Sequence, residues 1–271
     1  MADWLTVARG EAPLIVSLPH TGTEIPGGIE ARLVSPWLAR KDTDWHVEKL
    51  YDFAPPLGAT VIRTAICRTV IDCNRDPSGR SLYPGQATTE LCPTTSFDGE
   101  PLYRDGEAPD AGEIADRRAR WFEPYHAAIE GEIARLRARH ARVVLFDAHS
   151  IRSRIPRLFD GELPHLNFGS NDGASCDPAL LLAVESAAFA SRFSRVTDGR
   201  FKGGWTTRNY GKPESGVHVL QLELAIRSYL DEPDAVTPDN WPAPYRDERA
   251  AALRAVLARI LEACVRFSLH T

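Results

Sequence analysis

The sequence has little that would place it outside the ordinary globular enzymes. Its 271 residues include only five cysteines, which are scattered and form no C-x-x-C pair. Neither a disulfide framework nor a thiolate zinc site is therefore indicated. No apolar run reaches the ~18 residues of a membrane span, and the first residues lack the basic and apolar segments of a signal peptide. We expect a cytoplasmic protein.

The chain also lacks a strong excess of charge. It has 32 basic and 37 acidic residues, a net charge of −5, and no long block of one sign. We therefore expect neither a nucleic acid nor a membrane as a partner. There is no G-x-S-x-G nucleophile elbow and no glycine-rich phosphate loop. The length and the 43% hydrophobic content suit a single domain over residues 1–271; the oligomeric state leaves no trace in the sequence.

What the sequence does contain is short apolar runs that alternate with helical patterns. Apolar runs predict strands, and steps of three and four residues between apolar positions predict helices. The expected strands are 14–18, 60–66 with 69–71 as its partner or continuation, 143–146 and 217–224, and the expected helices are 44–53, 112–140, 178–191 and 246–266. This order indicates an α/β fold with a mixed, mostly parallel sheet flanked by helices. The poorly periodic segment 73–110 is expected to form a flap or rim over a site.

Chemically active side chains gather where the predicted strands end. His20 follows the first strand, Asp147-Ala148-His149 follows the run at 143–146, and Glu223 lies near the end of the strand at 217–224. Ligands of open α/β sheets bind outside the carboxyl ends of the strands. We therefore expect these side chains to share one site.

Two neutral imidazoles and one carboxylate, with a fourth position open, are the ligands of a catalytic zinc ion. His20 and His149 are the candidate imidazoles, although each could instead bond a neighbouring backbone group. The carboxylate is either Glu24 or Asp44, and Asp44 could alternatively cap a helix, as could Asp42. Asp147 is a candidate for orienting a ligand rather than binding the metal. Imidazole and carboxylate ligands would also suit cobalt or iron.

Two further segments carry cationic donors. Arg68-Thr69-Val70-Ile71-Asp72-Cys73-Asn74-Arg75 combines two arginines with an asparagine amide, a set suited to gripping a carboxylate. The plainer interpretation is a surface salt-bridge cluster. The glycine-rich segment 202–211 adds Lys202 and Arg208. Basic loops around a site in an acidic protein indicate a small acidic substrate. A cysteine nucleophile at position 73 is conceivable, but no signature supports it.

Longer motifs then point to a known family. They are Ser17-Leu18-Pro19-His20-Thr21-Gly22, Asp42-Thr43-Asp44-Trp45, Ile71-Asp72-Cys73-Asn74-Arg75, Ser81-Leu82-Tyr83-Pro84-Gly85-Gln86, Phe146-Asp147-Ala148-His149-Ser150 and Gln221-Leu222-Glu223-Leu224. From about Leu14 to Leu230 the chain resembles the N-formylglutamate amidohydrolases, or deformylases, which release formate and L-glutamate in histidine degradation. That family is similar in turn to the zinc exopeptidases, and the resemblance implies their α/β phosphorylase/hydrolase-like fold.

The resemblance also implies roles for individual residues. In the wider group a D-x-N-R element binds the substrate carboxylate, which assigns Asn74 and Arg75 to substrate binding beside Asp72. Arg68 matches an arginine that polarises the scissile carbonyl, and Glu223 matches the general base. The wider group takes its carboxylate ligand from the third residue after the first histidine, but residue 23 is threonine here. The deformylase resemblance favours Asp44 over Glu24.

The mechanism implied is hydrolysis of a formamide at a zinc ion held by His20, Asp44 and His149. Glu223 would deprotonate the zinc-bound water and later protonate the departing amine, while zinc and Arg68 stabilise the oxyanion. Arg75 and Asn74 would hold one glutamate carboxylate, and Arg208 or Lys202 the other. Two alternatives stay open: a zinc hydrolase of another N-acyl acidic amino acid, and a non-catalytic protein that binds acidic amino acids.

Overall fold

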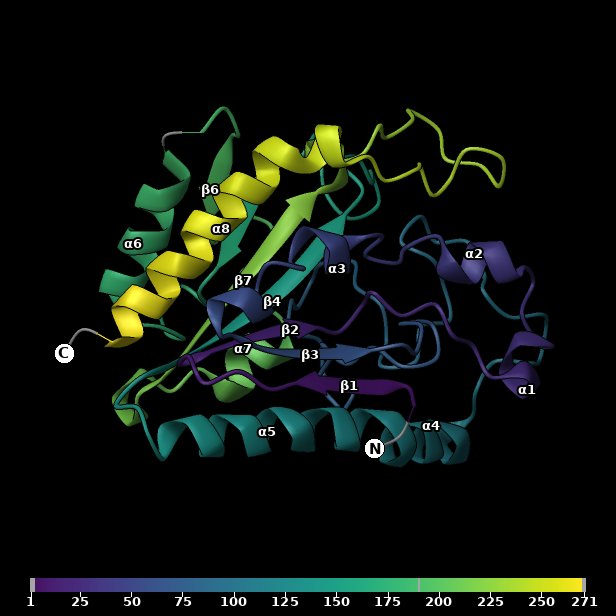
Figure 1. The fold of residues 1–271 in the computed structure, drawn as a ribbon. Coiled ribbons are helices and arrows are strands. Elements are labelled where there is room, and N and C mark those ends of the chain that lie inside the picture. Colours follow the sequence, from purple (N-terminus) through teal and green to yellow (C-terminus); the bar gives the residue numbers. More distant parts are fainter. Residues whose placement is uncertain (1–2, 190, 270–271) are drawn as a thin grey trace.

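A seven-stranded sheet forms the centre of the protein. The computed structural model describes residues 3–189 and 191–269, and Figure 1 shows its ribbon. The strands are β1 (Leu5–Ala8), β2 (Leu14–Leu18), β3 (Thr60–Thr64), β4 (Val143–Ile151), β5 (Leu166–Gly169), β6 (Arg195–Thr197) and β7 (Val217–Ala225). Their order across the sheet is β1-β3-β2-β4-β7-β5-β6. The run β3-β2-β4-β7 is parallel, whereas β1 and β5 each pair antiparallel with a neighbour. The predicted mixed, mostly parallel sheet is confirmed.

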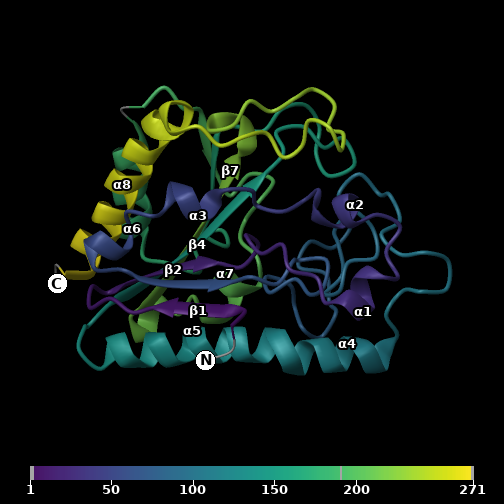
Figure 2. The same ribbon diagram turned by 45° about the vertical axis from the view of Figure 1, so that its right-hand side comes forward.

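Helices cover both faces of this sheet (Figures 1 and 2). The long helical stretch of α4 and α5 lies along one face, and α6 and α8 lie side by side on the other. The helices are α1 (Gly27–Glu30), α2 (Pro36–Arg40), α3 (Val47–Leu50), α4 (Ala111–Arg117), α5 (Glu123–Arg137), α6 (Pro178–Phe189), α7 (Trp205–Tyr210) and α8 (Asp247–Leu269). A π-helical stretch, Arg118–Phe122, joins α4 to α5. None of the helices in the described ranges is both long and apolar enough to cross a membrane.

Some local predictions were wrong. Thr69–Ile71 was expected to be a strand but belongs to a turn, in which the Val70 amide donates to the Cys67 carbonyl. Its apolar side chains are nevertheless buried, so burial at a turn imitated the signal of a strand. The expected helix 44–53 shrinks to α3. The strands β1, β5 and β6 were not predicted, because runs of three or four residues are too short to show a period.

The strand expected at 143–146 continues to Ile151, and this continuation places the site. In β4, Val143 and Leu145 point toward α5, and Asp147 and His149 follow on the same face because strand side chains alternate. β7 repeats the pattern, since Gln221 and Glu223 continue the face of Val219. The parallel register pairs Asp147 with Gln221 and His149 with Glu223. One face of the sheet thus changes from apolar to polar toward the carboxyl ends of its central strands.

A buried histidine of α5 forms hydrogen bonds to segments that lie beside this face of the sheet. His126 of α5 lies 2.9 Å through Nε2 from the Cys73 carbonyl and 2.9 Å through Nδ1 from the Tyr210 hydroxyl. The carbonyl can only accept, so Nε2 carries the hydrogen and Nδ1 accepts from Tyr210. Burial lowers the pKa of His126 to about 4. The ring is therefore neutral in the folded protein at pH 7 and connects α5, α7 and the loop that begins at Cys73.

This lowered pKa makes stability depend on pH. Below pH 6.5, the ordinary pKa of a histidine, the unfolded chain binds a proton at His126 that the folded chain accepts only near pH 4. The free energy of unfolding should therefore fall as the pH drops from about 6.5 toward 4. We predict that His126→Gln, which keeps a donor for the Cys73 carbonyl, loses about 2 kcal/mol less stability between pH 7 and pH 5 than the unsubstituted protein. Urea denaturation at both pH values measures this difference, and parallel losses in the two proteins would contradict it.

Candidate active site

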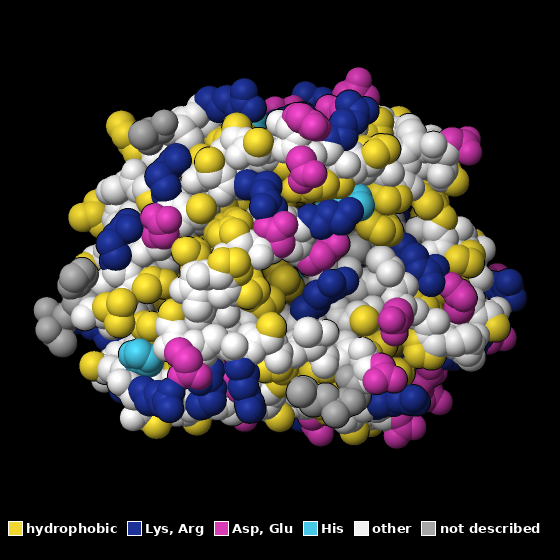
Figure 3. All heavy atoms as spheres, viewed as in Figure 1, with side chains coloured by type: hydrophobic (Ala, Val, Ile, Leu, Met, Phe, Trp, Pro, Cys, Tyr) yellow, Lys and Arg dark blue, Asp and Glu magenta, His cyan; other side chains and the backbone are white. Residues whose placement is uncertain are grey.

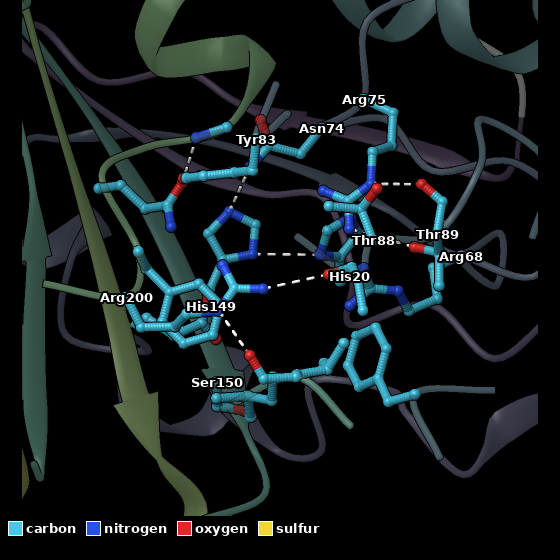
Figure 4. A pocket seen from close by; sticks show the side chains of 18 residues that line it. His20, Arg68, Asn74, Arg75, Tyr83, Thr88, Thr89, His149, Ser150 and Arg200 are labelled. Carbon is cyan, nitrogen blue, oxygen red and sulfur yellow. Dashed lines mark hydrogen bonds between the residues drawn. The ribbon is translucent and has the colours of Figure 1, made fainter. Parts of the chain in front are cut away.

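Two histidines and an aspartate meet where β2 and β4 end. His20 follows β2 by two residues, and its Nδ1 lies 3.1 Å from Nδ1 of His149. Oδ2 of Asp44 lies 3.1 Å from Nδ1 of His149 and 3.7 Å from Nδ1 of His20. All three side chains are buried, and their candidate ligand atoms all lie within 4.8 Å of one another. Figure 4 shows the two imidazoles facing each other.

Each imidazole is held from its other side by a carboxylate. Nε2 of His20 lies 2.7 Å from Oδ1 of Asp72, and Nε2 of His149 lies 2.9 Å from Oδ2 of Asp147. A carboxylate accepts hydrogen bonds, so both Nε2 atoms carry hydrogens and both Nδ1 lone pairs point into the cluster. Metal-binding histidines are commonly oriented in this way. The position of Asp147 fits its predicted role of orienting a ligand. Asp72 orients His20 in the same way.

This arrangement of donors fits a divalent metal ion. Two facing lone pairs at 3.1 Å repel each other unless a proton or a cation lies between them. Ligands at 2.0–2.1 Å from a tetrahedral zinc ion are roughly 3.3 Å apart, close to the spacings of the three donors. Oδ1 of Asp44 is buried without a hydrogen bond. Burial opposes a charge on both imidazoles; Asp147 and Asp44 nevertheless raise the pKa of His149 well above the usual value, whereas burial and Arg68 lower the pKa of His20.

The alternative ligand Glu24 lies elsewhere. Its side chain is exposed, and its backbone pairs with Ala65 and Cys67 beside β3. Asp44 is instead anchored next to the cluster, because its amide donates to the His20 carbonyl at 3.1 Å. The structure thus brings Asp44, and not Glu24, to the two histidines.

Asn74 supports the cluster from the side of Asp147. Its Nδ2 donates to Oδ2 of Asp147 at 2.9 Å, and its Oδ1 accepts from the Thr206 amide at 2.9 Å. The carboxamide rests on Gly204, where a Cβ atom would come within 2.4 Å of Nδ2. Asn74 lines the cavity, but these contacts already occupy its amide. The geometry therefore gives Asn74 a positioning role in addition to the predicted contact with substrate, which stays a prediction.

Arg68 and Arg75 both line the same cavity. Arg68 is buried; its Nη2 donates to Oδ2 of Asp72 at 2.7 Å, and its guanidinium lies 4.6 Å from the centre of the Phe97 ring. Arg75 donates through Nε to the Thr89 carbonyl and through Nη2 to the Thr89 hydroxyl, both at 3.1 Å. These bonds fix both guanidinium groups beside the cluster. The alternative of a surface salt-bridge cluster is wrong for Arg68.

Glu223 enters the cavity from β7, opposite His149 in the register. Burial raises its pKa to about 8, although His149 and Arg68 act in the opposite direction. A carboxyl with a pKa near neutrality can both accept and return a proton under physiological conditions. The position and the pKa of Glu223 suit the predicted general base.

The segment 73–110 supplies one wall of the cavity, as expected of a flap, through Tyr83, the residues 87–89 and Phe97. Next to this wall lies Arg200, which sequence reasoning missed; it also lines the cavity and donates to the Ala87 carbonyl. The predicted cations Arg208 and Lys202 do not line the cavity. Nε of Arg208 donates to the Gly203 carbonyl, and Lys202 forms an ion pair with Asp172 at the surface.

Arg200 lies after β6, only two residues before the basic segment 202–211 that was predicted to bind substrate. A search that began at the end of β6, which was itself not predicted, would have included it. Gln221 was also missed as a site residue, although it belongs to a recognised motif. Its Oε1 accepts from the Gly204 amide at 2.8 Å.

A cysteine nucleophile finds no support. Cys73 is buried, and burial together with the charge of Asp72 raises its pKa well above the usual value. The thiolate that nucleophilic attack requires is therefore disfavoured. All five cysteines are buried and free.

The chain is similar to known proteins over nearly its whole length. A curated N-formylglutamate deformylase of Pseudomonas aeruginosa is 48% identical over 263 residues, covering 97% of this chain and 96% of the relative. A second, from Pseudomonas putida, is 43% identical over 260 residues, covering 96% and 94%. The crystal structure of an N-formylglutamate amidohydrolase from Ralstonia eutropha JMP134 has the same fold, with a TM-score of 0.80, 22% identity and 98% of each chain covered.

The fold recurs in the crystal structure of a gene product of Agrobacterium tumefaciens, with a TM-score of 0.69, 17% identity, and coverage of 97% of this chain and 96% of that one. The sequence model of the N-formylglutamate amidohydrolases matches residues 12–230. That range contains the two histidines, Asp44, Glu223 and every arginine of the cavity. The chain is a hydrolase of amide bonds and belongs to the N-formylglutamate amidohydrolase family.

Proposed function

We propose that this protein is a metal-dependent enzyme that hydrolyses N-formyl-L-glutamate to formate and L-glutamate. The observation that carries the proposal is one cavity that combines a His20–Asp44–His149 cluster, a carboxyl with a pKa near neutrality and two fixed arginines. The two Pseudomonas relatives are named for this reaction. Residues 1–271 would act as one catalytic domain, and the reaction would serve histidine degradation in the cytoplasm.

His20, Asp44 and His149 would hold one divalent ion. Their nitrogen and oxygen donors suit zinc, with cobalt and iron as alternatives. When bound, such an ion acidifies a water molecule and polarises a carbonyl group. Asp72 and Asp147 accept hydrogen bonds from the Nε2 atoms of the two histidines, which would leave both Nδ1 atoms free of hydrogen to bind such an ion.

The other side chains would move the proton and bind the charged groups. Glu223 accepts a proton from the attacking water and passes it to the nitrogen as the bond from that nitrogen to the formyl carbon breaks. The guanidinium of Arg68 stabilises the negative charge that develops on the carbonyl oxygen. Arg75, fixed by Thr89, binds a substrate carboxylate. One water and one formamide give one formate and one amine, so the balance needs no further reactant.

A comparison of acyl groups and amino acids tests the proposed reaction. Formate or amine release is measured for N-formyl, N-acetyl and N-succinyl derivatives of glutamate, aspartate and glutamine. N-formyl-L-glutamate should have the highest kcat/KM. A preference for another derivative would indicate a related hydrolase with a different substrate, and binding without turnover would indicate a binding protein.

The metal site predicts the metal content of variants. The purified protein should contain close to one divalent metal per chain by elemental analysis, and His20→Ala or His149→Ala should remove most of it. Asp147→Asn should weaken metal binding by about 10- to 100-fold, because the amide no longer fixes the tautomer of His149. Circular dichroism checks that the variants are folded. Full occupancy in both histidine variants would disprove the site.

The proton-transfer role predicts a different result for Glu223→Gln. The glutamine keeps the shape and can form hydrogen bonds, but it cannot accept the proton of water. Turnover should fall by about 10² or more, while the metal content stays at the level of the unsubstituted protein. Loss of the metal in this variant would show that Glu223 is a ligand instead.

A further inference from the structure

Arg200 is a cation of the cavity rim that forms no ion pair with any acidic side chain in residues 3–189 and 191–269. Its Nε donates to the Leu158 carbonyl at 2.7 Å and its Nη2 to the Ala87 carbonyl at 3.1 Å. Within the described part of the chain, no aspartate or glutamate forms an ion pair with it, whereas Arg68 and Arg75 lie 2.7 and 3.7 Å from Asp72. Backbone carbonyls accept the hydrogen bonds of Arg200, but among the described residues no carboxylate lies within ion-pair distance of its charge.

This lack of a partner is costly because Arg200 is partly buried. Burial lowers the pKa of its guanidinium and the charge of Arg75 acts in the same direction, whereas Tyr83 and Glu223 act in the opposite direction. A charge taken out of water without a partner destabilises the protein. An anionic group that entered the cavity would compensate the charge of Arg200. The rim therefore suits an anionic ligand.

The guanidinium is also held in place before any ligand arrives. It lies 5.4 Å from the centre of the Tyr83 ring and 5.2 Å from that of Phe201. Tyr83 is fixed in turn, because its hydroxyl donates to the Gly203 carbonyl at 2.8 Å and accepts from the Lys202 amide at 3.0 Å. A fixed guanidinium loses little conformational entropy when it binds a carboxylate.

Arg75 and Arg200 approach the cavity from different directions. In the view of Figure 4, Arg75 lies on the side of His20 and Arg200 on the side of His149. Arg75 lies close to Asp72, which binds His20, so it belongs to the inner wall next to the metal cluster. Arg200 is held by carbonyls of two loops at the rim, around residues 87 and 158.

We propose that Arg200 binds the side-chain carboxylate of N-formyl-L-glutamate while Arg75 binds its α-carboxylate, an assignment that rests on the proposed function. The formamide must lie between the metal cluster and Glu223 for the reaction to occur. The α-carboxylate is attached to the carbon next to the scissile nitrogen, so it stays close to the cluster, where Arg75 is. The side-chain carboxylate extends farther and reaches the rim. Arg200, rather than Arg208 or Lys202, thus selects a diacid.

The test compares Arg200→Gln with the unsubstituted protein on three substrates: N-formyl-L-glutamate, its γ-amide (N-formyl-L-glutamine) and its α-amide. Loss of a charge-assisted contact should lower kcat/KM for the diacid by about 10- to 100-fold. The same substitution should lower kcat/KM for the α-amide to a similar extent and leave that for the γ-amide almost unchanged. Arg75→Lys should give the reverse pattern for the two amides.

Control variants separate local charge from general effects. Arg154→Gln removes an arginine that pairs with Glu162 and Asp234 outside the cavity, and it should keep the preference for the diacid over the γ-amide. Arg200→Lys restores a charge without the planar fork and should recover part of the preference. Metal content should be unchanged in both Arg200 variants. If Arg200→Gln does not fold, Arg200→Lys provides the same comparison with a smaller expected loss.

The outcomes distinguish this inference from the proposed function. Failure of the unsubstituted protein to hydrolyse N-formyl-L-glutamate would overturn the function itself. If that protein is active, equal penalties for Arg200→Gln on all three substrates would overturn the role of Arg200 alone. A penalty that disappears for the α-amide instead would reverse the assignment of the two carboxylates. Loss of the preference in Arg208→Gln, and not in Arg200→Gln, would transfer the role to Arg208.

Discussion

The site depends on the parallel pairing of β4 with β7. This pairing sets His149 beside Glu223 and Asp147 beside Gln221 on one face of the sheet. Because strand side chains alternate, a slip by one residue would turn all of one strand's polar groups into the apolar core on the other face. The buried, fully paired central strands leave no freedom for such a slip. The relative positions of the histidine and the base are therefore fixed by the backbone, before any contact between their side chains.

Buried charge is the second constraint on the structure. Asp44 belongs to the metal-ligand cluster, and Asp72 and Asp147 lie directly behind its two imidazoles. Arg68 and the imidazoles provide positive charge or hydrogen bonds to these three buried carboxylates. Buried carboxylates are costly unless each is paired or hydrogen-bonded. A divalent cation would complete the compensation at Asp44, the one with a buried oxygen that lacks a hydrogen bond. Arg75, which lies 3.7 Å from Asp72, and Arg200 add further positive charge to the wall of the cavity. On the outer face seen in Figure 3, by contrast, basic and acidic side chains are interspersed.

The sequence predicted the elements with strong patterns and the residues at their ends. The long helical stretch from α4 to α5, the buried runs of β2 and β7, and the grouping of His20, His149 and Glu223 followed from periodicity and from the geometry of parallel sheets. The choice of Asp44 over Glu24 came from the family resemblance, because distance along the chain would have favoured Glu24, four residues after His20. Arg200 could not be found by either route. Arg200 stands out because none of the described carboxylates forms an ion pair with it. That property depends on which residues surround Arg200 in the folded protein, and its neighbours in the sequence do not reveal it.

Gly204 connects Arg200, through the chain, to the residues that support the metal-ligand cluster. It touches the Asn74 carboxamide, which supports the pair formed by Asp147 and His149, and it lies four residues after Arg200 in the same segment. Its amide is also bound by Gln221. Any change in the number of residues between 200 and 204 would displace either the guanidinium at the rim or the support of the metal cluster. The length of this short connection is thus constrained by the contacts at its two ends, those of Arg200 with the Leu158 and Ala87 carbonyls and that of Gly204 with Asn74.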